Sequence, residues 1–218
     1  MRTNKLMLRL LSGSLAPLFL LPCLLPAQSW EAGGSAGYSI YRDASVTAST
    51  VTGRTGFSPG IAFGGLLGND VSRFVGGEVR YTYQAGDPRV SSGSTKARAD
   101  GESHALHYDV LIHATRKEAA VRPFVAVGAG VKIFRGTGAE PAFQPLSNLI
   151  VLTHTTQVEP LISVGAGLKF KVSRHVRFRL DFRDYATPVP EKLLASPSGK
   201  AGGWMHGFVF LAGISTVF

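Results

Sequence analysis

The chain has 218 residues, a formal net charge of +9 and a single cysteine. This length favours one domain. The basic residues are scattered along the chain without a Lys/Arg-rich run, which argues against a nucleic-acid partner because phosphate binding needs bases gathered on one face. Gly accounts for 26 residues and helix-length amphipathic segments are few, so the composition favours an all-β chain with many turns.

Residues 1–27 have the layout of a secretory signal peptide. Basic residues precede an apolar run over 10–25, and the small residue Ala27 follows it. Prolines interrupt the run, and it is shorter than the roughly 20 residues that a spanning helix needs. We expect cleavage after Ala27, leaving 28–218 as one barrel domain. Cys23 lies inside the signal, so the mature domain lacks disulfides, thiolate metal sites and cysteine nucleophiles.

Alternation of apolar and charged residues is the dominant pattern after residue 27. In the segment from Val176 to Arg183, every even position is apolar and every odd position is charged. Successive side chains of a strand point to opposite faces, so this segment predicts a strand with one apolar and one charged face.

Eight segments fit this pattern as strands. Most are longer than strands of soluble proteins and match a tilted membrane crossing of about 9–11 residues. The eight segments are Trp30–Tyr41, Phe57–Leu66, Phe74–Gln84, His104–His113, Val121–Phe134, Val158–Phe170, Val176–Tyr185 and Trp204–Phe218.

The connections between these strands alternate in length. Short connections cover 67–73, 114–120 and 171–175, whereas long ones cover 42–56, 85–103, 135–157 and 186–203. Outer-membrane barrels combine short periplasmic turns with long outer loops. The sequence therefore predicts an eight-stranded antiparallel up-and-down transmembrane β-barrel with both termini in the periplasm.

Alternation alone leaves open which face points inward, because a soluble ligand-binding barrel would bury its apolar face. Strand length, loop asymmetry and aromatic residues near strand ends favour the membrane arrangement. These aromatic residues are Trp30, Tyr38, Tyr41, Tyr83, Tyr185 and Trp204.

Two glycine-containing stretches and the last strand carry a family resemblance. Residues 123–130 read Pro-Phe-Val-Ala-Val-Gly-Ala-Gly, residues 164–170 read Val-Gly-Ala-Gly-Leu-Lys-Phe, and the chain ends on Phe218 after Phe210 and Ile214 at even spacing. The pattern resembles the small outer-membrane β-barrel proteins, which include opacity proteins, OmpX-like proteins and the barrel domain of OmpA-like proteins. The resemblance implies an outer-membrane location. It also implies that Phe210, Ile214 and Phe218 form an assembly signal read by the barrel-insertion machinery.

In the membrane arrangement, the charged face lines the lumen. Eight strands leave an interior barely wide enough for side chains, so we expect these groups to pair and plug it. A narrow channel for small solutes is the alternative. Inward glycines at 128, 130, 165 and 167 would leave room for long arginines opposite them. The expected lumen network consists of Glu31, Glu78, Asp109, Glu159 and Asp181 with Arg80, Arg122, Lys132, Lys169, Arg177, Arg179 and Arg183.

His107, Asp109 and His113 share one strand face and are the best candidates for a catalytic or metal site. The two histidines are about 20 Å apart at 3.3 Å per residue, too far to hold one ion. A lipid A-modifying barrel enzyme is a further alternative, but the His-x-Ser pair of barrel deacylases does not occur in this sequence. We therefore expect no enzyme activity, no cofactor and no metal.

The long loops are rich in Gly, Ser, Thr and Pro and nearly balanced in charge, which predicts mobile, solvated loops. Their bases suit outer-membrane lipids and the phosphates of lipopolysaccharide. We expect a monomeric, non-catalytic outer-membrane protein with an envelope-structural or surface-interaction role through these loops. The sequence does not identify a surface ligand.

Overall fold

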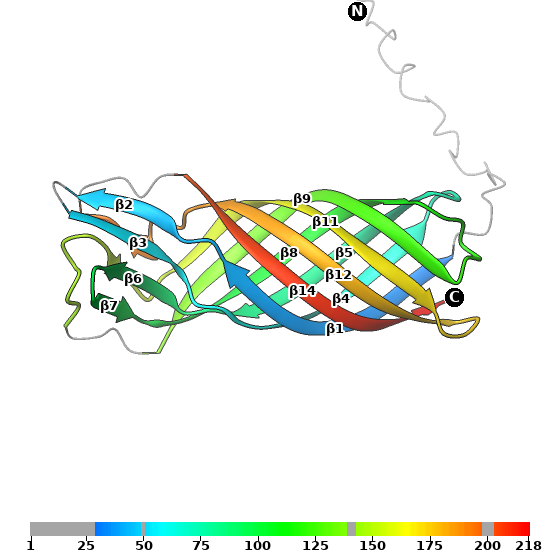
Figure 1. The fold of residues 1–218 in the computed structure, drawn as a ribbon, viewed down its shortest axis with the longest axis horizontal. Helices are drawn as coiled ribbons and strands as arrows, with labels where there is room; N and C mark the ends of the chain where they lie inside the picture. The colour runs from blue at the N-terminus through cyan, green and yellow to red at the C-terminus, as the bar shows by residue number, and fades with distance from the viewer. Residues whose placement is uncertain (1–28, 49–50, 139–142, 198–202) are drawn as a thin grey trace, which may run out of the picture.

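A computed structural model of the protein describes residues 29–48, 51–138, 143–197 and 203–218. The predicted signal peptide lies outside these residues. Eight long antiparallel strands form a closed barrel in which each strand pairs with its neighbours in the chain, and β1 closes the ring with β14 (Figure 1). This confirms the predicted eight-stranded up-and-down barrel. The barrel strands are β1 (Trp30–Tyr41), β4 (Gly60–Asp70), β5 (Val75–Ala85), β8 (Asp100–His113), β9 (Val121–Thr137), β11 (Thr156–Lys171), β12 (Val176–Pro188) and β14 (Trp204–Val217).

The second predicted strand is the one placed least accurately. The sequence pattern gave 57–66, whereas β4 covers Gly60–Asp70. Phe57 belongs to a separate short strand outside the barrel, and its ring stacks on Phe134 with 5.1 Å between centroids. The strand continues past its predicted end at Leu66. Leu66 faces the lumen and Leu67 faces the outside, as successive residues of one strand do.

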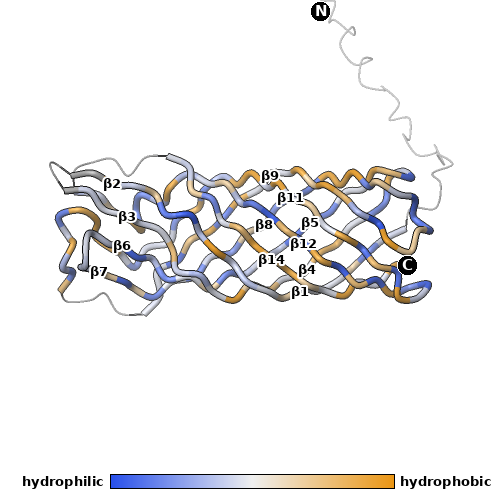
Figure 2. Tube along the Cα trace, in the orientation of Figure 1, coloured by the Kyte–Doolittle hydropathy of each residue, from blue (hydrophilic) through white to orange (hydrophobic). Residues whose placement is uncertain are grey.

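Strand parity separates the two faces of the wall as expected for a membrane. In β12, Leu180 and Phe182 are 40% and 36% exposed on the outside, whereas Arg179 and Arg183 are buried in the lumen. Polar and apolar positions alternate along the barrel strands (Figure 2). Arginine on a lipid-facing surface costs about 2–4 kcal/mol at mid-bilayer, so the observed parity suits a lipid environment. The described residues include no helix that could span a membrane.

The wall continues beyond the barrel at the end opposite the carboxyl terminus (Figure 1). Short strands there form a four-stranded sheet in the order β2-β3-β6-β7, which repeats the order β1-β4-β5-β8 of the wall below it. A second pair, β10 and β13, joins the last two long connections. The short strands are β2 (Ala44–Ala48), β3 (Val51–Phe57), β6 (Pro88–Ser92), β7 (Thr95–Arg98), β10 (Val151–Leu152) and β13 (Leu194–Ala195).

These strands and their connections form what we call the cap: residues 42–59, 86–99, 138–155 and 189–203, as far as the structure describes them. The cap has its own apolar core, which corrects the expectation of solvated loops. Each connection supplies only a few apolar residues, and they meet only when the connections pack together. The core consists of Tyr41, Val46, Phe57, Val90, Ala99, Phe134, Leu146, Leu149, Ile150, Leu152, Val189, Leu193, Leu194 and Met205.

Candidate functional site: the filled lumen and the cap

Glu31 on β1 is the centre of a hydrogen-bonded group in the lumen. This group lies at the end of the barrel where the carboxyl terminus is found. Lys169 Nζ donates to its carboxylate at 2.6 Å and Arg179 Nη1 at 2.8 Å. Ser215 Oγ on β14 adds a third hydrogen bond at 2.7 Å. All four residues are buried. One carboxylate therefore links β1 to β11, β12 and β14.

The middle of the lumen holds three guanidinium groups and two carboxylates. Arg80 Nη2 lies 2.7 Å from Glu78 Oε1 and 3.0 Å from Asp181 Oδ1. Arg179 Nη2 lies 2.8 Å from Glu78 Oε2, and Arg183 Nη2 lies 3.3 Å from Asp181 Oδ1. Buried charges are tolerated when they are paired and hydrogen-bonded. Each guanidinium in this cluster has a carboxylate partner, although Arg183 Nη2 lies at ion-pair distance without a hydrogen bond.

A polar chain continues from this cluster toward the cap. Arg183 Nε donates to Asp109 Oδ2 at 3.2 Å. Asp109 Oδ1 lies 2.9 Å from His107 Nδ1, and His107 Nε2 lies 3.0 Å from the Tyr185 hydroxyl. Thr82 Oγ1 completes the chain at 3.2 Å from the same hydroxyl. The histidine and aspartate that were candidates for catalysis are thus buried and engaged inside the lumen.

Arg122 pairs with Asp70, which lies in a segment where the sequence pattern predicts a short turn. Arg122 Nη1 donates to both carboxylate oxygens of Asp70 at 2.9 and 2.8 Å, and Nη2 donates to the Arg73 carbonyl at 3.2 Å. Asp70 is the last residue of β4, so this pair fastens the β4–β5 turn to β9.

Lys132 lies buried between the ion-pair cluster and the cap. Its Nζ donates to Gln84 Oε1 at 2.9 Å and to the Tyr41 hydroxyl at 3.2 Å. The rings of Tyr41, Phe134 and Tyr185 lie 4.6, 5.1 and 5.7 Å from Nζ. In the part of the chain that the structure describes, no carboxylate pairs with Lys132. Aromatic faces and two neutral oxygens therefore hold this buried cation.

Two residues expected in the lumen network lie outside it. Glu159 is half-buried and accepts a hydrogen bond from Gln157. Arg177 is half-buried and donates to the Lys117 carbonyl at 3.5 Å. Both residues point inward near a strand end, so they reach the mouths of the barrel rather than its charged centre.

Two tyrosines expected among the interfacial aromatics also face the lumen. Tyr41 is 5% exposed and Tyr185 is 1% exposed, whereas Trp30, Tyr38 and Trp204 are 42%, 47% and 53% exposed on the outside. Proximity to a strand end alone therefore does not show which aromatic side chains face the membrane. The alternation of side chains along each strand decides whether a residue faces the lumen or the outside.

The inward glycines make room for several kinds of side chain. A Cβ on Gly165 would lie 2.7 Å from Arg183 Cδ, as expected for a glycine opposite a long arginine. A Cβ on Gly167 would instead meet the Phe124 ring at 2.4 Å. That ring lies about 5.5 Å from three cationic groups, those of Lys169, Arg179 and Arg183. Phe124 thus joins the network without having been predicted.

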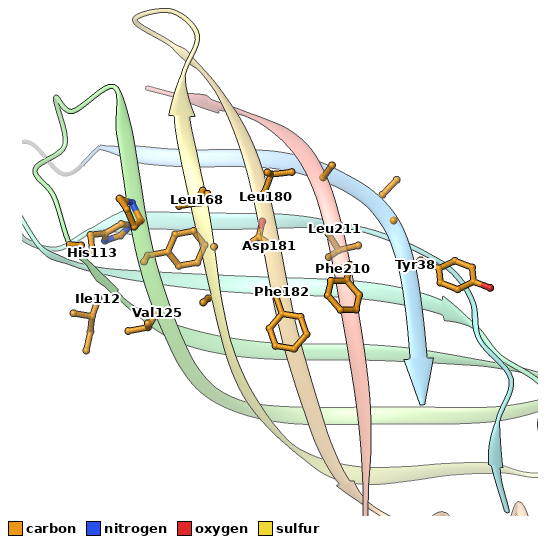
Figure 3. A pocket seen from close by; sticks show the side chains of 18 residues that line it. Tyr38, Ile112, His113, Val125, Leu168, Leu180, Asp181, Phe182, Phe210 and Leu211 are labelled. Carbon is orange, nitrogen blue, oxygen red and sulfur yellow. The ribbon is translucent and has the colours of Figure 1, made fainter. Parts of the chain in front are cut away.

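The outside of the wall carries a broad apolar hollow of about 960 Å³ across β8, β9, β11, β12, β14 and β1 (Figure 3). Phe182 and Phe210 lie side by side on its surface with ring centroids 5.0 Å apart. The small side chains of Ala166 and Ala212 also line the hollow. Phe210, Ile214 and Phe218, the expected assembly signal, are 50%, 63% and 67% exposed on the same outer face.

Comparison with known proteins identifies the family. Residues 15–205 match the outer membrane protein beta-barrel domain. The chain belongs to this family. It follows that the protein is integral to the outer membrane, and the soluble-barrel alternative is wrong. No curated protein sequence matches the chain.

Solved structures show the same fold at low sequence identity. OprG of Pseudomonas aeruginosa is 12% identical over 88% of this chain and 95% of its own, with a TM-score of 0.56. Neisserial surface protein A is 12% identical over 87% of this chain and 97% of its own, with a TM-score of 0.52. Likeness at this identity concerns the fold alone.

Proposed function

We propose that this protein is a non-catalytic outer-membrane barrel that acts at the cell surface through its cap, while its lumen stays closed. The observation that carries this proposal is the apolar core of the cap, which rests directly on the filled lumen. Tyr41 and Phe134 belong to that core and also surround the Lys132 ammonium. Cap and lumen are therefore one packed unit.

The layered contents of the lumen support closure. From the end with the carboxyl terminus, the Glu31 group is followed by the Glu78 and Asp181 cluster, the Lys132 layer and the cap core. Opening a path for solutes would require separating buried ion pairs, and leaving one buried charge without its partner costs about 3–5 kcal/mol.

The engagement of His107 and Asp109 supports a non-catalytic role. Both residues are at most 3% exposed, and both ring nitrogens of His107 already have partners in Asp109 and Tyr185. A general base must reach its substrate within hydrogen-bond distance, which this pair cannot do in the packed lumen.

The proposal places the cap outside the cell and both termini in the periplasm. Short turns follow β4, β8 and β11 at the end where β14 finishes, and the long connections lie at the other end (Figure 1). In this orientation Phe210, Ile214 and Phe218 lie on the strand that the insertion machinery would read.

Cysteine labelling of intact cells tests the proposal, since the predicted mature chain has no cysteine. Glu191 is exposed on the cap and Arg174 is exposed in the turn after β11. A membrane-impermeant maleimide should label Glu191→Cys on intact cells, and Arg174→Cys only after the outer membrane is permeabilised. The reverse pattern would refute the orientation, and no labelling of Glu191→Cys would refute a surface role of the cap.

A further inference from the structure

The sheet β2-β3-β6-β7 of the cap has one apolar and one cationic face. Val46, Thr55 and Val90 are buried on the side of the cap core. The alternate positions carry bases on the outer side, and we call this group the cationic face. It consists of Arg54 on β3, Arg89 on β6 and Lys96 and Arg98 on β7.

The register of the sheet brings these four bases together. Arg54 lies opposite Ser91, and Ser91 lies opposite Lys96, so the two bases flank one serine. Arg89 lies directly opposite Arg98 in the adjacent row. With strands about 4.8 Å apart, the four positions fall within a patch about 10 Å wide.

Carboxylates neutralise only part of this charge. Asp43 pairs with Arg89 at 3.0 Å, and Asp87 pairs with Arg98. Arg54 and Lys96 have no ion pair within the described ranges. The four bases therefore outnumber the two carboxylates, and an added anion would meet the uncompensated charge of Arg54 and Lys96. Ser45 lies opposite Arg54 on the same face and adds a hydroxyl donor.

The cationic face continues the lipid-facing wall. Tyr83 and Arg89 project from the same side of one nearly continuous strand, β5 followed by β6. Arg89 follows Tyr83 by six residues, which corresponds to about 15 Å along the axis of a tilted strand. Arg89 and its neighbour Arg98 therefore lie on the part of the cap that adjoins the wall, where the saccharide layer of the outer leaflet would surround them in the proposed orientation.

We infer that the cationic face binds the phosphorylated saccharide of lipopolysaccharide in the surrounding leaflet. Phosphate groups accept charge-assisted hydrogen bonds from Arg and Lys, and several anionic groups on one saccharide match several bases on one face. This inference rests on the proposed outward orientation of the cap, which the maleimide labelling tests independently.

Titration of fluorescently labelled rough lipopolysaccharide into the protein in neutral-detergent micelles tests the inference. The test variant is Arg54→Gln/Lys96→Gln. Lys171→Gln/Arg174→Gln is the control, since it removes the same charge from exposed positions at the opposite end. Migration on unheated gels verifies that each variant is folded. Exposed ionic contacts contribute up to about fivefold each, so we expect binding to the test variant to weaken about tenfold while the control binds as the wild type does.

Two further binding measurements identify which chemical groups of the ligand are recognised. Removing the phosphates from the lipopolysaccharide should weaken binding to the wild type about as much as the double substitution does. Phosphatidylglycerol should compete poorly, because it offers a single phosphate without a saccharide. Equal losses in both variants, binding independent of phosphate, or equal competition by phosphatidylglycerol would each overturn the inference. None of these results would alter the labelling pattern that tests the proposed function.

Discussion

Glu31 and Arg179 lie 2.8 Å apart in the lumen although 148 residues separate them in the chain. Glu31 places a carboxylate on β1 and Arg179 a guanidinium on β12, and β14 lies between these two strands. The ion pair therefore spans the seam where the two ends of the chain close the barrel. Lys169 reaches the same carboxylate from β11, so one buried anion adds two side-chain ion pairs to the backbone pairing of β1 with β14.

Replacing Glu31 with Gln should destabilise the barrel. The substitution leaves Arg179 and Lys169 buried with one counterion fewer, and removing one partner of a buried pair costs about 3–5 kcal/mol. Urea unfolding in phospholipid vesicles, followed by tryptophan fluorescence, measures the loss. Glu118→Gln, at an exposed turn position, is the control and should change the free energy of unfolding by less than about 0.5 kcal/mol. Equal effects of both substitutions would contradict the account of the seam.

Replacing Lys132 with Met should leave the barrel at least as stable as the wild type. Lys132 has no carboxylate partner among the residues that the structure describes. Met fills a similar volume among the three rings, and Gln84 Oε1 still accepts from the Tyr41 hydroxyl. Substituting an apolar residue for a buried ion is often neutral or stabilising by about 1–4 kcal/mol. Lys169→Met is the matched comparison. This substitution removes the ammonium group that pairs with Glu31 and should lower the free energy of unfolding by about 3 kcal/mol. A comparable loss for Lys132→Met would show that its ammonium has a partner essential to the fold.

An arginine on the outer face at mid-wall should oppose insertion. Val127 on β9 is 53% exposed and lies in one row with Val110 and Val164. Val127→Arg should lower the free energy of unfolding in vesicles by about 2–4 kcal/mol. Val172→Arg, in the exposed turn after β11, should have little effect because the side chain stays in water. Tolerance of arginine at position 127 would place this part of the wall outside the hydrocarbon region.

The cap should lose its packing without loss of the barrel when its core is truncated. Leu149 is fully buried in the cap core, and Leu→Ala in a core costs about 2–5 kcal/mol. Limited proteolysis of the folded protein should cut Leu149→Ala within 143–155 faster than the wild type, while migration on unheated gels is unchanged. Phe143→Ala, at a position 80% exposed, is the control. Equal cleavage of all three proteins would mean that this connection does not depend on the core.

The period of two in the sequence predicted the barrel because it reports which face each side chain occupies. It placed Arg179, Asp181 and Arg183 in the lumen and Leu180 and Phe182 outside, as the structure shows. The same period says nothing about partners in other strands. The pairs Glu31–Arg179 and Asp70–Arg122 depend on register and barrel diameter, which no local pattern specifies.

The cap could not be predicted for a related reason. Its core takes Val46 from one connection, Val90 from another, and Leu149 and Leu194 from the last two. Among many Gly, Ser and Thr residues, each connection alone has too few apolar residues to indicate a buried structure. The apolar residues become a core only after the barrel has brought the four connections to one end.

Planar-bilayer recording tests the closed lumen most directly. We expect bilayers verified to contain the protein to show no stable conductance steps, because ion pairs fill the lumen and the cap core covers it. Stable and reproducible steps carried by small ions would contradict it and would favour a narrow channel.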